Sequence, residues 1–215
     1  WWPRGGVGLR ASTGWESVDS TRDFTRQFHI IDQLRPQTEY EFLIEGRALG
    51  EERAHCSMMA SFRTAPEEAE RAALTFTVIT GQEYARRDDE LGGHRIFAHM
   101  QLLAPDFFVH TGDVVYHDKP GPFAKSPELA RYKWNRIYAM PLQRSFHATV
   151  PSWFMTDDHD VLKNDCWPGQ SYGELSWDEG LSIFREQTPS GPLPYRRLRW
   201  GKDVEVWFLE GREFR

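Results

Sequence analysis

The chain has 215 residues, of which 40% are hydrophobic and 14% aromatic, so it can bury the core of one or two domains. Its net charge is −6, which argues against nucleic acid as the main partner because there is no basic surplus to neutralise phosphates. No apolar run approaches the roughly 20 residues that a membrane-spanning helix needs, and no signal peptide opens the chain.

Residues 1–66 are predicted to form a small β domain. Strands are expected over residues 29–34 and 36–44, and the second of these runs alternates between apolar and acidic side chains. A last strand over residues 61–66 closes the segment. The Leu-x-Pro-x-Thr-x-Tyr pattern that begins at Leu34 and the Phe-x-Thr-Ala-Pro ending resemble a fibronectin type III-like or purple-acid-phosphatase N-terminal sandwich, here in partial form.

A polar, charged linker at residues 67–73 leads into a region that alternates between strands and helices, as in a layered α/β domain over residues 74–215. Two of the helices have clear start signals, since Ser126 precedes a proline and Ser176 begins a capping box. The expected elements are strands at residues 74–79, 106–110 and 152–156, helices at 94–103, 126–139 and from 177 to before Pro189, and a hairpin at 195–200 and 204–209.

Acidic side chains follow two of the predicted strands at the point where each strand ends. The apolar run 107–109 breaks into Thr111-Gly112-Asp113, and the run 153–155 gives way to Asp157-Asp158-His159-Asp160. In open α/β sheets, ligands sit at the carboxyl ends of strands. Hard oxygen ligands with one imidazole can hold a di- or trivalent metal, which would polarise a phosphoryl oxygen and acidify a bound water. Taken singly, each piece has a plainer interpretation as a turn cap or an acidic surface loop.

Four blocks together carry a family resemblance. They are Gly112-Asp113-Val114-Val115-Tyr116, Trp134-Asn135-Arg136-Ile137-Tyr138, Asp157-Asp158-His159-Asp160 and Glu210-Gly211-Arg212. In this order and at these separations, they resemble the alkaline phosphatase D (PhoD-like) family, a branch of the calcineurin-like metallophosphoesterases. The resemblance implies that residues from about 74 onward form the first half of an αββα sandwich, and that the chain is truncated at both ends.

The resemblance also implies a set of metal ligands. Asp113 would bridge metals, Tyr116 would bind iron through its phenolate, and Asp158 would coordinate metal. The cofactors implied are Fe³⁺ and Ca²⁺, with Mn²⁺ or Zn²⁺ as other candidates. From the residues alone, Tyr116 could equally be a packing aromatic.

Further residues would take part in catalysis. His159 would donate a hydrogen bond to a phosphoryl oxygen or protonate the leaving group, and Asp157 and Asp160 would orient its imidazole. Asn164 could touch metal or substrate. Arg212 could reach a substrate phosphate or hold the loop through a salt bridge, and the sequence leaves these two readings open.

The chain departs from the family pattern in two places. Gly81 stands where the family has a cysteine that ligates iron, and Gln82 or Glu83 would have to substitute for it. The family's later Gly-Asp-x-His block does not occur in the sequence.

The two cysteines are not expected to do chemistry. Cys56 and Cys166 fall in different predicted domains, so a disulfide is not expected, and cysteine alone cannot build a zinc cluster. Cys166 is interpreted as a buried or incidental thiol.

The predicted function is metal-dependent hydrolysis of phosphate esters, of the alkaline phosphatase or phosphodiesterase type, with a small-molecule phosphate ester as substrate. The 215-residue fragment itself is expected to be inactive or nearly so. The alternatives are a related hydrolase such as a sulfatase on the same scaffold, or a non-catalytic binding protein without metal. The resemblance implies a secreted or periplasmic location.

Overall fold

The N-terminal part of the chain forms one antiparallel sheet. The computed structural model describes residues 1–5, 11–30 and 34–214. Strands β1 (Trp2–Pro3), β2 (Glu39–Gly46) and β3 (Cys56–Arg63) pair in that order.

The structure matches one of the strands predicted for this part and differs in the bounds of another. The alternating run was correctly predicted as β2, whereas β3 begins five residues before the expected strand at 61–66 and ends at Arg63. Residues 31–33 of the strand expected at 29–34 lie outside the described residues, and their described neighbours are not in a strand. A second sheet of a sandwich does not occur among the described residues up to 66, so the fibronectin-like domain and its boundaries stay predictions.

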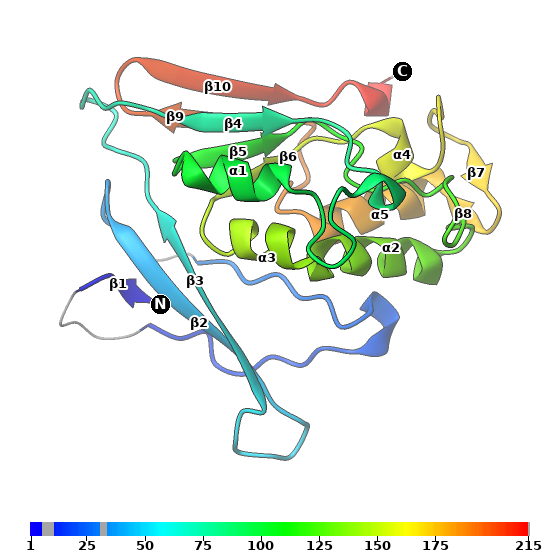
Figure 1. The fold of residues 1–215 in the computed structure, drawn as a ribbon, viewed down its shortest axis with the longest axis horizontal. Helices are drawn as coiled ribbons and strands as arrows, with labels where there is room; N and C mark the ends of the chain where they lie inside the picture. Colours follow the sequence, from blue (N-terminus) through cyan, green and yellow to red (C-terminus); the bar gives the residue numbers. More distant parts are fainter. Residues whose placement is uncertain (6–10, 31–33, 215) are drawn as a thin grey trace.

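A three-stranded parallel sheet forms the centre of the molecule. Its order is β4 (Phe76–Ile79), β5 (Phe107–His110) and β6 (Ser152–Phe154), as Figure 1 shows. All four residues of β5 are buried, because the strand lies between two neighbours and both faces of the sheet are covered. The carboxyl ends of the three strands meet at one edge, where the acidic turns begin.

A β-hairpin covers one face of this sheet. Strands β9 (Tyr195–Trp200) and β10 (Val204–Leu209) pair with each other, as the sequence predicted. Buried Trp200 and Phe208 pack with Phe107 and Val109 of β5. The ring of Phe208 also stacks on Trp153 at a centroid distance of 5.2 Å. Alternate residues of β5 therefore face the hairpin.

Helices cover the other face. Helices α1 (Ile96–Leu102) and α3 (Pro141–His147) bury Phe97 and Phe146 against Phe108. The ring of Phe146 meets that of Phe108 edge-on at 5.1 Å. Helix α1 begins two residues after the predicted start at residue 94, whereas α3 was not predicted.

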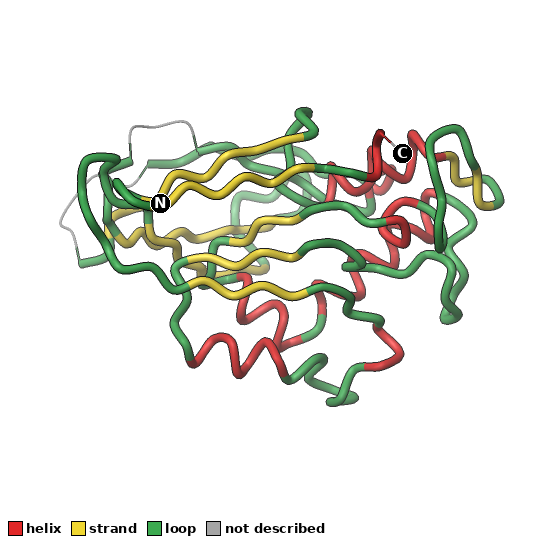
Figure 2. The backbone as a smooth tube through the Cα atoms, turned by 90° about the horizontal axis from the view of Figure 1, so that it is seen from above, coloured by secondary structure: helices red, strands yellow, loops and turns green. Residues whose placement is uncertain are grey.

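A second group of helices packs beyond the carboxyl ends of the strands (Figures 1 and 2). It contains α2 (Pro127–Ala139), the short α4 (Asp158–Val161) and α5 (Trp177–Gln187), with Trp134 fully buried among them. Both predicted caps are present: Ser126 accepts from the Leu129 N–H, and Ser176 and Glu179 form a reciprocal capping box. Short strands β7 (Ser171–Tyr172) and β8 (Leu175–Ser176) lead into α5.

The architecture confirms the layered α/β fold class. Figure 2 shows the strands running side by side, with helices gathered beyond one end and along one flank. No described helix has the length and apolar character needed to cross a bilayer. The described cysteines are both free, Cys56 exposed and Cys166 buried.

Candidate metal centre

The first turn of the site leaves β5 through Gly112 and Asp113. Both residues have positive φ, 115° and 59°, which bends the chain sharply at the strand end. A Cβ on Gly112 would lie 2.5 Å from the Cβ of Asp157, so only glycine lets this turn approach the turn after β6 so closely. The two acidic blocks predicted from sequence thus come into direct contact.

The second turn is the start of α4. Asp157 is the N-cap of this helix and forms a capping box with Asp160, a helix start that was not predicted for these two residues. Asp158 and His159 occupy the first helical positions and are 5% and 7% exposed. Their side chains are held by a helix start rather than by a free loop.

Asp113, Asp158 and His159 converge at one point. Each offers one ligand atom, and these atoms lie within 4.8 Å of one another. One Asp113 oxygen, Oδ1, is buried without a hydrogen-bond partner. Burial raises the pKa of the Asp113 carboxyl, and this effect together with the charges of Asp157 and Asp158 outweighs the lowering by His159. A bound cation would neutralise these charges, so the donor set and the orphaned oxygen both fit a metal ion.

Asp160 does not face this point but joins the two turns. Its carboxylate accepts the N–H groups of Asp113 at 2.7 Å, Val115 at 3.0 Å and Asp157 at 2.9 Å. It is fully buried, and burial raises its pKa to about 8, against the effect of the three donors. Asp160 therefore holds the two turns together, and no described contact joins its carboxylate to the imidazole that it was predicted to orient.

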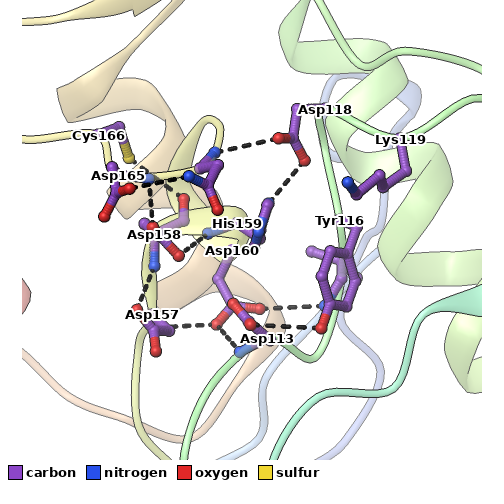
Figure 3. Close-up of polar contacts among 12 residues, drawn as sticks. Asp113, Tyr116, Asp118, Lys119, Asp157, Asp158, His159, Asp160, Asp165 and Cys166 are labelled. Atoms are coloured by element: carbon purple, nitrogen blue, oxygen red, sulfur yellow. Dashed lines mark hydrogen bonds and ion pairs between the residues drawn. The ribbon is translucent and has the colours of Figure 1, made fainter.

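Tyr116 lies on the ligand side of the same turn (Figure 3). Its hydroxyl donates to Oδ2 of Asp113 at 3.3 Å, and its ring lies 4.5 Å from that of His159, centroid to centroid. Burial and the Asp113 charge raise the pKa of the phenol. A Cβ on Gly81 would come within 3.0 Å of the Tyr116 hydroxyl, so the glycine in the family's cysteine position lies beside this group.

Asp118 also belongs to the candidate site, although it was not predicted from the sequence. Its Oδ1 is 2.6 Å from Nδ1 of His159, and its Oδ2 accepts the Asn164 N–H at 3.0 Å. Burial lowers the pKa of His159, but the bond to Asp118 and the charges of nearby carboxylates outweigh it, so the pKa is raised. The available signal was an acid two residues after Tyr116 in the first block.

The remaining predicted residues occupy the rim. Asn164 is exposed, and its side chain donates to Asp165 at 2.9 Å rather than toward the ligand group. Arg212 forms ion pairs with Asp157 and, at 3.8 Å, with Asp158. The contacts of Arg212 therefore match the salt-bridge alternative.

A buried network holds the second turn to the hairpin. Glu210, at the end of β10, accepts the N–H of Thr156 at 2.9 Å and its hydroxyl at 2.6 Å. The same carboxylate pairs with Arg196 at 2.9 Å, and Arg196 also donates to the Phe154 carbonyl. Glu210 and Arg212 of the fourth block thus hold the turn from one strand end.

The fold and the donor set define an α/β protein with a group that could hold a metal ion at the carboxyl ends of adjacent parallel strands. The family model described as PhoD-like phosphatase matches residues 76–215, more than half of the chain. The chain belongs to the PhoD-like phosphatase family, which confirms the resemblance inferred from its sequence.

Two solved structures share the fold. "Structure of PhoD" matches with a TM-score of 0.59 and 18% identity over 78% of this chain and 36% of that chain. The purple acid phosphatase PPD1 from yellow lupin (Lupinus luteus) seeds matches with a TM-score of 0.53 and 15% identity over 78% of this chain and 29% of that chain. The chain thus spans about a third of the length of these structures. No curated protein matches it.

Proposed function

We propose that this chain is part of a metal-dependent phosphoric ester hydrolase. The observation that carries the proposal is the convergence of Asp113, Asp158 and His159 within 4.8 Å, at the strand ends of a PhoD-like fold. The carboxylates of Asp113 and Asp158 are hard oxygen donors, so Fe³⁺, Ca²⁺, Mn²⁺ and Zn²⁺ are all candidates, and His159 lies beside the ion as an acid rather than as a ligand. When bound, a metal would polarise the phosphoryl oxygen and acidify a water.

His159 acts as the general acid in this proposal. The Nδ1–H of His159 donates to Oδ1 of Asp118, which leaves Nε2 of His159 as the nitrogen that can donate to a phosphoryl or leaving-group oxygen. The raised pKa of His159 keeps the imidazole protonated to higher pH than usual, as an acid requires.

Tyr116 and Asp113 bind the metal together in this proposal. Their side chains already meet through a hydrogen bond, and a bound ion would replace the phenol proton. Without a thiolate at Gly81, the described donors near Tyr116 are oxygens and one imidazole nitrogen.

A binding protein without metal is the second candidate. It is favoured by Gly81, which offers no ligand atom at the strand end beside Tyr116. Metal analysis separates the two candidates, since the hydrolase predicts a stoichiometric metal and the binding protein predicts none. A sulfatase on the same scaffold would bind metal but prefer sulfate esters.

The hydrolase is tested with two variants that should fail differently. Asp113→Asn removes an anionic ligand and should lower the metal content measured by elemental analysis. His159→Ala should retain most of the metal but lose turnover of p-nitrophenyl phosphate by ~10²–10⁴-fold, the contribution of a positioned acid. Equal loss of metal from both variants would show that His159 is a ligand.

Activity should depend on how much of the family domain the protein contains. Because the chain covers 36% of the PhoD chain, we expect the 215-residue protein to be inactive or nearly so and a version that extends through the rest of the family domain to be active. Rapid turnover by the 215-residue protein would contradict this expectation. A secreted or periplasmic location remains a prediction.

A further inference from the structure

Most of the cations around the site are already engaged. Arg212 pairs with Asp157 and Asp158, and His159 bonds to Asp118. Below the first turn, Lys133 of α2 is 3% exposed and donates to the backbone carbonyls of Tyr116 and Lys119. Neither Arg212 nor Lys133 can turn toward a substrate without breaking a contact that holds the site together, and His159 has only its Nε2 left to offer.

Lys119 differs from them. Its backbone is fixed, because its N–H bonds to the Tyr116 carbonyl at 3.3 Å and its own carbonyl accepts from Lys133 at 2.6 Å. Its side chain is half-buried, and no hydrogen bond or ion pair joins its ammonium to another residue in the described part of the chain. Figure 3 shows this ammonium directed toward the side on which Tyr116, Asp118 and His159 gather.

An unpaired positive charge at this place would help the site to attract an anionic substrate. A phosphate ester that approaches Asp113 and His159 enters a region where carboxylates outnumber free cations, since Asp113, Asp118, Asp157 and Asp158 gather there. A metal offsets part of this charge, and a free ammonium beside it attracts the anion further. Lysine binds phosphate as a point charge on a flexible stem, so it needs no second donor in a fixed fork.

We propose that Lys119 binds a non-bridging oxygen of the substrate's phosphoryl group and makes the site selective for phosphate monoesters over diesters. The proposal rests on the proposed function and names its substrate class. A monoester carries close to two negative charges at neutral pH and a diester carries one. Because the Coulomb energy scales with the product of the charges, removal of Lys119 weakens the attraction to the monoester more than to the diester.

The experiment compares Lys119→Ala and Lys119→Arg with wild type. The control is Lys202→Ala, which removes the same charge from the exposed turn between β9 and β10. Inorganic phosphate is titrated calorimetrically into the manganese-loaded protein. Lys119→Ala should bind phosphate about 10- to 100-fold more weakly, as expected for the loss of one charged hydrogen bond, with unchanged manganese content. Lys119→Arg and Lys202→Ala should stay within about threefold of wild type.

The kinetic measurements use the longer protein that extends through the rest of the family domain. Lys119→Ala should lower kcat/KM for p-nitrophenyl phosphate several-fold more than for bis-p-nitrophenyl phosphate. Equal losses for the two esters, or unchanged phosphate affinity, would overturn the role of Lys119 while hydrolysis by wild type leaves the proposed function intact. If phosphate binding depends on Lys119 but wild type hydrolyses neither ester, the proposed function is overturned while the role of Lys119 in binding an anion is kept.

Discussion

At the scale of single residues, Asp118 links two parts of the site. One of its oxygens bonds to His159 and the other to the backbone of Asn164, so a single carboxylate fixes both the imidazole and the segment after α4. The side chains of His159 and Asp118 are only 9% and 14% exposed, which limits screening by solvent. The contribution of the His159–Asp118 pair to the free energy of unfolding should therefore be measurable in the metal-free protein.

The stability that this pair contributes changes with pH in a direction set by the two pKa shifts. The folded pKa of His159 is raised, so the stability from its protonation is complete below the unfolded pKa of about 6.5 and is lost as pH rises through the higher folded value. Burial raises the pKa of Asp118, but bonds from His159 and Asn164 lower it more. The stability from its ionisation is complete above about pH 3.9 and is lost as pH falls through the lower folded value.

Asp118→Asn should therefore reduce the free energy of unfolding most between about pH 4 and 6.5, and less at pH 8.5. Urea denaturation of the metal-free protein at several pH values measures this window. A loss that is equal at pH 5 and pH 8.5 would show that Asp118 contributes hydrogen bonds but no ion pair with His159.

At the scale of elements, the end of β10 holds the turn after β6 that carries Asp158 and His159. Glu210 binds Thr156, the residue before the N-cap Asp157, and neutralises Arg196. The Glu210 and Arg196 side chains are 5% and 11% exposed, so each depends on the other for charge compensation.

We expect Glu210→Gln to lower the free energy of unfolding by about 3–5 kcal/mol, since it leaves a buried guanidinium without its counter-ion. Glu205→Gln is the matched control. Glu205 lies on the same strand and pairs with Arg197 and Arg199, but it is 28% exposed, so its loss should cost about 0–1 kcal/mol. Chemical denaturation measures both, and similar losses would contradict the role given to Glu210.

Local signals in the sequence predicted some elements and not others. Ser126 and Ser176 marked the starts of α2 and α5, and the apolar run ending at His110 marked β5, because caps and buried strands depend on adjacent residues. The four-residue α4 is too short to show helical periodicity. Asp118 and His159 are separated by 41 residues, and only the fold brings them together.

At the scale of the whole molecule, the N-terminal segment is attached to the helical layer. Gln27 places its amide nitrogen 2.9 Å from the carbonyls of Arg185, Glu186 and Thr188 at the end of α5. The Asn135 side chain of α2 donates to Asp23. Asn135 belongs to one of the family blocks, and its described contacts serve packing of the segment.

Gln27→Ala should lower the free energy of unfolding by roughly 1–2 kcal/mol, because it leaves carbonyls at the end of α5 without a donor. Gln101→Ala, which removes one exposed side-chain bond to Thr149, should have a smaller effect. Thermal unfolding followed by circular dichroism compares the two. Equal effects would mean that the segment does not stabilise the helices.

The three N–H groups that donate to Asp160 should become exposed together when the site opens locally. The amides of Asp113, Val115 and Asp157 come from two turns that are distant in sequence, yet they share one buried carboxylate. If that carboxylate leaves, all three amides lose their acceptor together. Their protons should therefore exchange with deuterium at a common rate, as one cooperative unit, and the two turns of the site should open together or not at all.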